Sequence, residues 1–330
     1  MARSHLTLAA LATSAVAELD VVGAAPFGSA GRGDFDAAVI TGRDGRHWIV
    51  RVPRSERAEQ QQSADLVALR ALSQGVRARL PFDVTVYAGQ APVDGTRAIV
   101  SEFVAGTPVT LAGIDLELAD SIGRAIAAVH ALPTSLVTDA GLPTQTSVDA
   151  HRATLALVDR AAATGLVPAA LLNRWEQAGS DAGLWQYTPA VVNGDLGAAS
   201  FLASSGDVTG VLGWHGLRVA DPARDLFWVL GTRRDGIADA VFDAYTRDRG
   251  TVDRRLRQRA TLHSELEVAR WLLHGTEQRD TAIVDDAVRM MSRLVDDVTG
   301  DATESISPPT LPILAVDEVE ALLDRAERVS

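Results

Sequence analysis

Hydrophobic and polar residues alternate through much of the first hundred residues, a pattern typical of β-strands. Residues 37–41 and 48–52 read as strands, and the Asp44-Gly45 pair between them predicts a hairpin turn. A helix over 58–79 and further strands near 84–87 and 98–103 follow. The first part of the chain is therefore expected to form a small antiparallel sheet covered by a helix.

Beyond residue 105 the apolar residues recur every three or four positions, as in residues 118–129, which predicts helices with one buried face. Further helices are expected at 148–163, 167–180, 222–232, 235–247, 253–275 and 279–298. Two short strands, 200–203 and 208–212, interrupt them. The pattern predicts an α+β protein with three parts: a β-rich lobe over 1–104, a helical lobe over 105–304, and a linker with a terminal amphipathic helix over 305–330.

The first seventeen residues have two interpretations. One early Arg, an apolar stretch and small residues at its end resemble a signal peptide, but the stretch is too short to span a bilayer and contains Thr7, Thr13 and Ser14. On a helix, one face would carry Leu6, Ala9, Ala10 and Thr13. We favour the N-terminal helix of a cytoplasmic protein over a signal peptide.

The charge composition limits the kinds of partner. All 31 basic residues are Arg, and 43 acidic residues give a net charge of −12, which argues against nucleic acids and anionic membranes. The absence of Cys excludes disulfides and thiolate metal sites. A small molecule is the expected ligand, and we favour a monomer.

Residues 191–226 contain the most informative pattern. An apolar pair leads into Gly194-Asp195, the two short strands follow, and an Asp221-Pro222 pair with Asp225 closes the segment. In phosphoryl transfer, a carboxylate accepts the proton of the attacking hydroxyl, while side chains on the next hairpin bind the metal ions that neutralise the phosphates. Asp195 occupies the position of that catalytic carboxylate.

This segment resembles the loop of the aminoglycoside phosphotransferase family and, within it, of the macrolide 2'-phosphotransferases. The matching residues are Gly194, Asp195, Leu196, Thr209, Gly210, Trp214, Asp221, Pro222, Asp225 and Leu226. Residues 48–54, 122–130 and 265–275 resemble the third strand, the first large-lobe helix and a late helix of the family. The resemblance implies a bilobal protein-kinase-like fold and ATP or GTP as the nucleotide.

The departures from the family pattern fall on the chemistry. Asn193 replaces a His, Ser200 replaces the metal-binding Asn or His, and Gly213 replaces the metal-binding Asp. Neither Ser200 nor Gly213 supplies a carboxylate, so the sequence argues against a functional Mg²⁺ site. Of the nearby polar residues, His215 is a poor Mg²⁺ ligand because that ion prefers oxygen, and Asp207 is expected at an exposed hairpin tip.

The resemblance also assigns residues to the nucleotide. It implies that Arg51 holds the phosphates with Asp65 as its partner, that Gly31 lies in a covering glycine loop, and that Glu102 and Val104 form the hinge that meets the base. Other interpretations remain open: Arg51 and Asp65 as two solvated charges, and the glycines as an ordinary turn.

Three functions follow from these observations. The first, which we favour, is a family member that binds a nucleotide or small molecule while metal-dependent transfer is impaired or lost. The second is an active ATP- or GTP-dependent O-phosphotransferase for a macrolide- or aminoglycoside-like substrate, with Asp195 as the base. The third is a non-catalytic interaction protein.

Overall fold

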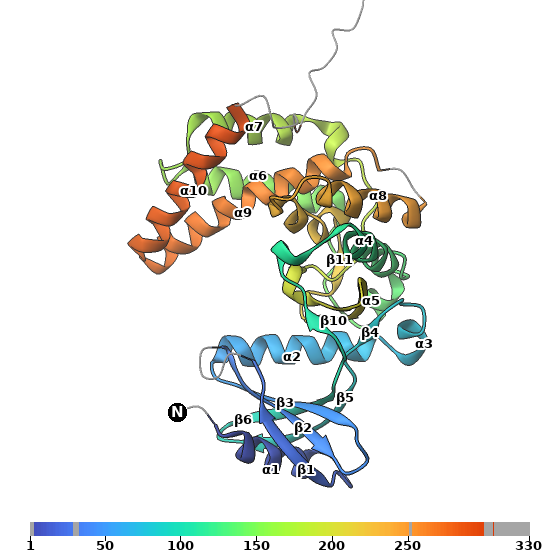
Figure 1. The fold of residues 1–330 in the computed structure, drawn as a ribbon. Helices are drawn as coiled ribbons and strands as arrows, with labels where there is room; N and C mark the ends of the chain where they lie inside the picture. The colour runs from blue at the N-terminus through green and yellow to red at the C-terminus, as the bar shows by residue number, and fades with distance from the viewer. Residues whose placement is uncertain (1–2, 29–32, 251–252, 300–305, 307–330) are drawn as a thin grey trace, which may run out of the picture.

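The computed structural model describes residues 3–28, 33–250, 253–299 and 306, which form a β-rich lobe and a helical lobe joined by a short hinge (Figure 1). The predicted α+β architecture, with a β-rich lobe followed by a helical lobe, is confirmed. Most of the segment 305–330, where a linker and a terminal helix are predicted, lies outside the described residues. Ile306 is described and packs into the core of the helical lobe.

The β-rich lobe is built on a five-stranded antiparallel sheet with one helix on each face. The strand order is β1 (Val21–Pro26), β2 (Phe35–Gly42), β3 (His47–Pro53), β6 (Thr96–Glu102) and β5 (Tyr87–Val93). Helix α1 (His5–Ala15) covers the outer face, and α2 (Glu56–Ala71) lies across the face toward the helical lobe (Figure 1). Helix α2 is thereby placed at the boundary between the lobes.

The helix predicted over 58–79 is interrupted. Helix α2 ends at Ala71, and the short α3 (Gln74–Arg77) follows a break at Leu72, whose ψ of 70° is not helical and whose side chain is fully buried. The predicted strand 84–87 is also divided. Its first part, β4 (Asp83–Val84), leaves the lobe's own sheet and pairs in parallel with a strand of the helical lobe.

The helical lobe contains two small sheets among its helices. Strands β7 (Thr107–Pro108), β9 (Phe201–Ser204) and β10 (Asp207–Val211) form a four-stranded sheet with β4, and β8 (Ala190–Val192) pairs with β11 (Arg218–Ala220). The remaining elements are η1 (Leu111–Gly113), α4 (Leu116–His130), α5 (Ser135–Asp139), α6 (Ser147–Ala162), α7 (Ala169–Ser180), η2 (Ala182–Trp185), η3 (Ala198–Ser200), η4 (Pro222–Asp225), η5 (Phe227–Gly231), α8 (Ile237–Arg249), α9 (Leu256–Gln278) and α10 (Thr281–Thr299).

The short 3₁₀ helices η4 and η5 replace the single helix predicted over 222–232. Pro222 opens η4, and the backbone leaves the regular helical path at Leu226, with a φ of −113°. Both 3₁₀ helices pack against α9. The kink brings the Asp225 side chain back toward the preceding loop.

Three apolar clusters stabilise the fold. One lies between α1 and the five-stranded sheet, and one joins α6, α7, α9 and α10. The third contains α4, α8, the strands around residues 191–220 and the end of α2, with Trp214 fully buried. The segment with the catalytic-type motif is therefore supported by a core that both lobes share.

Helix α1 belongs to the folded lobe, and the face that it buries is not the one that carries Leu6 and Thr13. Leu8 and Ala12 are buried against the sheet, whereas Leu6 is 68% exposed. Ser4 caps the helix, because its side chain accepts a hydrogen bond from the backbone N–H of Thr7. Among the helices of the described residues, none is both long and apolar enough to cross a bilayer.

The packing of α1 predicts unequal effects of two leucine substitutions. Leu8→Ala should lower the free energy of unfolding by about 2–5 kcal/mol, because Leu8 is 1% exposed and its removal leaves a cavity. Leu6 lies on the same helix but is exposed to solvent, so Leu6→Ala should change the free energy of unfolding by less than about 0.5 kcal/mol. Urea denaturation of both variants measures the difference, and equal effects would show that α1 does not pack as described.

Candidate functional site

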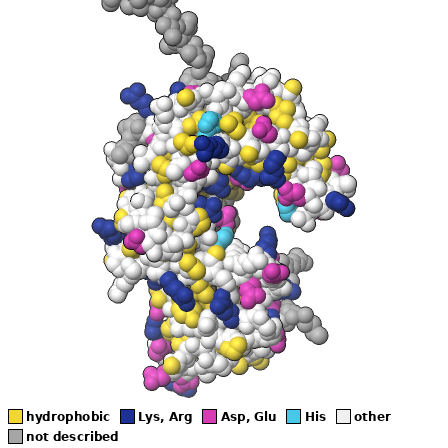
Figure 2. All heavy atoms as spheres, turned by 180° about the vertical axis from the view of Figure 1, so that it is seen from behind, with side chains coloured by type: hydrophobic (Ala, Val, Ile, Leu, Met, Phe, Trp, Pro, Cys, Tyr) yellow, Lys and Arg dark blue, Asp and Glu magenta, His cyan; other side chains and the backbone are white. Residues whose placement is uncertain are grey.

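A cleft separates the two lobes and is visible as a deep notch in Figure 2. One link across it is a hydrogen bond from the backbone N–H of Trp214 to Asp65 Oδ1, at 2.6 Å. Asp65 lies on α2 of the β-rich lobe, and Trp214 lies between β10 and β11 of the helical lobe. The segment around Trp214 thus forms part of the cleft between the lobes.

The buried carboxylate of Asp225 fixes the loop that carries Asp195. Its two oxygens accept hydrogen bonds from the backbone N–H groups of Asn193 and Gly194, both at 2.7 Å, and Oδ2 lies 3.1 Å from His130 Nε2. Gly194 has a φ of +85°, and a Cβ there would lie 2.5 Å from the Gly216 carbonyl oxygen. A glycine is therefore required at this turn.

Asn193 connects this loop to the segment that carries Gly213. Its side-chain amide donates to the Gly213 carbonyl at 2.9 Å, while its Oδ1 accepts the backbone N–H of Asp195 at 3.2 Å. Asn193 is completely buried. Asn193, which stands where the resemblance implies a His, therefore still supports both sides of the loop.

Asp195 extends into the cleft and meets His215. Its side chain is 65% exposed, and Oδ2 lies 2.9 Å from His215 Nε2. The His215 ring is also in contact with Gln61 of α2, whose Nε2 lies 3.3 Å from His215 Nε2. A protonated His215 would place a positive charge directly beside the carboxylate that resembles a catalytic base.

The positions of the two expected metal ligands carry no side chain that suits Mg²⁺. Ser200 Oγ accepts a hydrogen bond from the backbone N–H of Gly197 at 3.2 Å and is neutral. Gly213 has no side chain. Asp207 cannot replace it, because Asp207 lies at the hairpin tip, where it accepts hydrogen bonds from Ser121 and Arg124. Within the described ranges, no group of three His, Asp or Glu side chains could hold a metal ion.

Arg51 and Asp65 face the same cleft without forming an ion pair with each other. The Arg51 guanidinium stacks on the ring of Phe35, 4.0 Å from its centroid. Although solvent can reach it, the surrounding protein lowers the pKa of Arg51, and the charge of Asp65 opposes that effect. Burial raises the pKa of Asp65, against the hydrogen bond from Trp214 and the charge of Arg51. Because an arginine stays protonated and Arg51 forms no ion pair with Asp65, its guanidinium can bind an anion.

The hinge presents an unused backbone group where the base of a nucleotide is expected. Glu102 N donates to the Val86 carbonyl and Phe103 N to the His47 carbonyl, whereas Val104 N and O take part in no hydrogen bond among the described residues. The Glu102 side chain is paired with Arg46. Gly31, the residue predicted in the covering loop, lies outside the described residues.

Asp221 lies at the start of η4, and side chains of α9 bind its carboxylate. It accepts hydrogen bonds from Arg259 Nε at 2.9 Å, His263 Nε2 at 3.1 Å and the backbone N–H of Ala223 at 3.0 Å. Burial alone would raise the pKa of Asp221, but the His263 hydrogen bond and the Arg259 guanidinium outweigh it and hold the pKa at about 2. Asp221 is therefore ionised at all physiological pH values.

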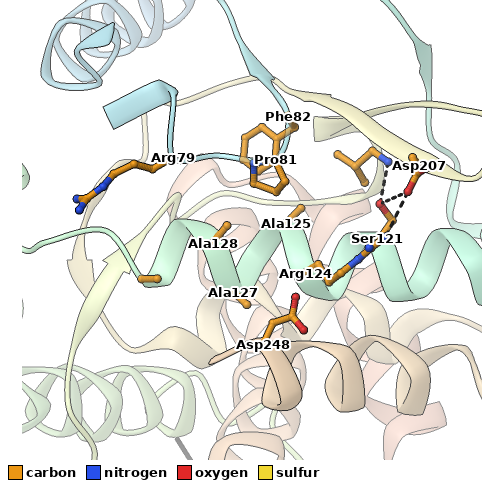
Figure 3. A pocket seen from close by; sticks show the side chains of 12 residues that line it. Arg79, Pro81, Phe82, Ser121, Arg124, Ala125, Ala127, Ala128, Asp207 and Asp248 are labelled. Atoms are coloured by element: carbon orange, nitrogen blue, oxygen red, sulfur yellow. Dashed lines mark hydrogen bonds and ion pairs between the residues drawn. The ribbon is translucent and has the colours of Figure 1, made fainter. Parts of the chain in front are cut away.

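A separate cavity of about 540 Å³ lies between α4 and the segment that follows α3 (Figure 3). Pro81 and Phe82 stand on one side of it, Arg124 and Asp207 at one end, and Asp248 on the opposite side. None of the predicted site residues lines it. It is therefore distinct from the cleft that contains Asp195.

A family model described as the phosphotransferase enzyme family matches residues 30–263, more than two thirds of the chain. The chain belongs to the phosphotransferase enzyme family. The resemblance inferred from residues 191–226 is thereby confirmed, and the family assignment covers both lobes.

Solved structures of this family share the fold. Macrolide 2'-phosphotransferase MphH from Brachybacterium faecium is 22% identical, with a TM-score of 0.69 over 82% of this chain and 93% of that one. The type I macrolide 2'-phosphotransferase is 24% identical, with a TM-score of 0.69 over 87% and 96%. The GDP complex of aminoglycoside 2'-phosphotransferase-IIIa is 17% identical, with a TM-score of 0.70 over 88% and 98%.

A curated relative is the uncharacterized protein YcbJ of Bacillus subtilis, strain 168. It is 27% identical over 210 residues, which are 58% of this chain and 65% of YcbJ. The aligned part thus spans just under two thirds of that relative.

The burial of His263 predicts a pH dependence of stability. Burial lowers the pKa of His263 below the ordinary value of 6.5, so the unfolded chain binds a proton that the folded protein does not. As the pH falls below about 6.5, the free energy of unfolding should decrease by up to about 1.4 kcal/mol per pH unit from this residue. The Asp221 carboxylate, with a pKa of about 2, stays ionised over this range.

Denaturant unfolding of the wild type and of His263→Gln, from about pH 7 to about pH 5, measures this effect. The variant should lose less stability with acidification than the wild type. His274→Gln, at an exposed position on the same helix, is the control and should follow the wild type. Parallel curves for the wild type and His263→Gln would contradict a neutral, buried His263.

Proposed function

We propose that this family member binds a purine nucleotide in the cleft and that its Mg²⁺-dependent phosphoryl transfer is impaired or lost. The observation that carries this proposal is the pair Ser200 and Gly213. Neither supplies a carboxylate, while the loop around Asp195 keeps its hydrogen bonds. The residues therefore suit nucleotide binding but do not suit the metal ions.

Three features support a nucleotide in the cleft. Arg51 offers a charged guanidinium at the position that the family resemblance assigns to the phosphates. Val104 offers an unused backbone N–H and carbonyl at the hinge. Several related structures contain GDP or ADP, as their names state for the aminoglycoside 2'-phosphotransferase-IIIa and APH(2'')-Ib complexes.

The loss of the metal ligands sets how far the rate of phosphoryl transfer is expected to fall. A bound metal ion contributes several kcal/mol of charge stabilisation, and each ~1.4 kcal/mol corresponds to a tenfold change in rate. Residue 200 supplies only a neutral hydroxyl, and residue 213 has no side chain. We therefore expect turnover to be lower than in an enzyme with both metal ligands, by a factor on the order of 10³. Ser200 and Gly213 therefore do not fit a Mg²⁺ ion, which prefers charged oxygen ligands.

An active small-molecule phosphotransferase is the second candidate. It is favoured by one observation, the exposed and well-oriented Asp195. Its substrate would be a hydroxyl compound of the macrolide or aminoglycoside type, because the related structures include enzymes with those names. Phosphorylation of such a panel that is lost in Asp195→Ala would favour this candidate over impaired transfer.

The proposed function predicts that nucleotides bind without Mg²⁺. ATP and GTP at about 100 times Kd should raise the free energy of unfolding by about 2.7 kcal/mol, which thermal unfolding detects as a higher Tm. The increase should be equal with and without Mg²⁺. Arg51→Gln should weaken it, whereas Arg43→Gln, at an exposed arginine that pairs with Asp20 away from the cleft residues, should change it little.

Two results would contradict this function in different ways. A stabilisation that appears only with Mg²⁺ would show that the chain still holds the metal and would favour an active enzyme. No response to either nucleotide would favour a non-catalytic interaction protein.

A further inference from the structure

Three arginines of the helical lobe lie on elements that pack next to one another and to the strand before the Asp195 loop, and we call them the arginine row: Arg218 of β11, Arg224 of η4 and Arg270 of α9. Arg218 opens β11 and pairs in register with Val192, immediately before the loop that carries Asp195. Its Nε donates to the Gly216 carbonyl at 2.7 Å and lies 3.1 Å from where a Cβ of Gly194 would be. The guanidinium therefore sits beside the Asp195 loop.

Arg224, the central residue of the row, has a charged side chain without a partner. It lies in η4, and its Nε is enclosed by protein with no hydrogen-bond acceptor. No hydrogen bond or ion pair from its guanidinium occurs among the described residues. Arg259 nearby differs, since Asp221 and Asp253 both accept from it. Enclosed groups that can hydrogen-bond normally have partners, so the unpaired Nε is unusual, and the partly exposed guanidinium of Arg224 is open to an anion.

Arg270 continues the row on α9. This helix packs against η4, and Arg270 follows His263 by seven residues, on the same helix face. Burial is the main cause that lowers the pKa of both Arg218 and Arg270, and the charge of Arg224 lowers both further. The charge of Arg224 therefore acts on both of the other arginines, and arginine side chains remain protonated.

The acidic groups near the row are already occupied. Asp225 accepts from the loop backbone and faces His130, Asp221 is bound by Arg259 and His263, and Glu267 is paired with Arg270. Asp195 faces His215. Figure 2 shows arginine side chains on the wall of the notch, with acidic and histidine side chains beside them. Because those acidic groups near the row already have partners, Arg224 is left as a positive charge without a partner among the described residues.

We propose that the arginine row binds a carboxylate or phosphate group of the small molecule that lies against the helical lobe beside Asp195. Arginine suits such groups because its planar guanidinium donates two parallel hydrogen bonds to them. A cationic amino sugar would be repelled at the same place. The inference deepens the proposed function by naming the chemical class of the second ligand, but it requires neither nucleotide nor metal.

Titration with simple anions tests the row. Inorganic phosphate and succinate are added separately to the full chain, with NaCl at matched ionic strength as the reference, and Tm is measured. At least one of the two anions should raise Tm saturably, and the one that acts more strongly identifies phosphate or carboxylate as the natural group. No saturable response to either would overturn the proposal.

Variants of the row separate binding from structure. Arg224→Gln should abolish most of the anion response, and its Tm without anion should be equal to or above that of the wild type, because an uncompensated charge is removed. Arg233→Gln, at an exposed arginine between η5 and α8, should keep the full response. A lower Tm of Arg224→Gln together with an unchanged anion response would show that Arg224 is only structural.

A saturating concentration of ADP, without Mg²⁺, distinguishes this ligand from the nucleotide's own phosphates. The anion response should persist with ADP present, and Arg51→Gln should weaken the ADP response alone. If ADP abolishes the anion response, the row holds nucleotide phosphates and the proposal is wrong. If ADP does not bind at all, the proposed nucleotide function fails, while the anion titration still decides the row.

Discussion

The buried carboxylate of Asp225 is the interaction on which the rest of the site depends. It joins three elements, because it extends from η4, accepts from two backbone N–H groups of the Asp195 loop, and contacts His130 of α4. Charge-assisted hydrogen bonds of this kind are about twice as strong as neutral ones. Without it, the left-handed turn at Gly194 and the exposed position of Asp195 would lose their support.

The scaffold is therefore kept for reasons of packing and hydrogen bonding, independently of the metal ligands. Asn193 bonds the Gly213 carbonyl, and Trp214 reaches Asp65 through its backbone N–H, so the chain around the ligand positions is held in place. What differs is the chemistry of the side chains within that frame. The cleft contains cations supplied by the protein, Arg51 on one side and the arginine row on the other.

Much of the fold could be predicted from the sequence, since turn residues, apolar spacing and the motif around Asp195 act locally. The failures have tertiary causes. Helix α2 ends at Ala71 because Leu72 turns into the shared core, and α1 buries Leu8 because the sheet, not the helix, selects the face.

The candidate site could be predicted only in part. The loop positions follow from spacing, and the structure brings Asp195, Arg51 and Asp65 to one cleft. The contact between His215 and Asp195 depends on how residues 20 positions apart are folded together, which no local pattern contains. The missing partner of Arg224 is likewise invisible in the sequence, because it depends on how Asp221 and Asp225 are already bound.

The proposed function requires that the hydrogen-bonded frame around Asp195 is intact while residues 200 and 213 supply no metal ligand. Gly213 has a φ of +73°, a region that Asp tolerates better than most residues, and a Cβ there would meet only His215 Nδ1, at 4.0 Å. The most direct test is Mn²⁺ binding, measured by electron paramagnetic resonance with ADP, in the wild type and in Ser200→Asn/Gly213→Asp. The wild type should bind Mn²⁺ no more tightly than ADP alone, and the double variant at least about tenfold more tightly, ~1.4 kcal/mol. Equal, tight binding by both proteins would contradict the claim.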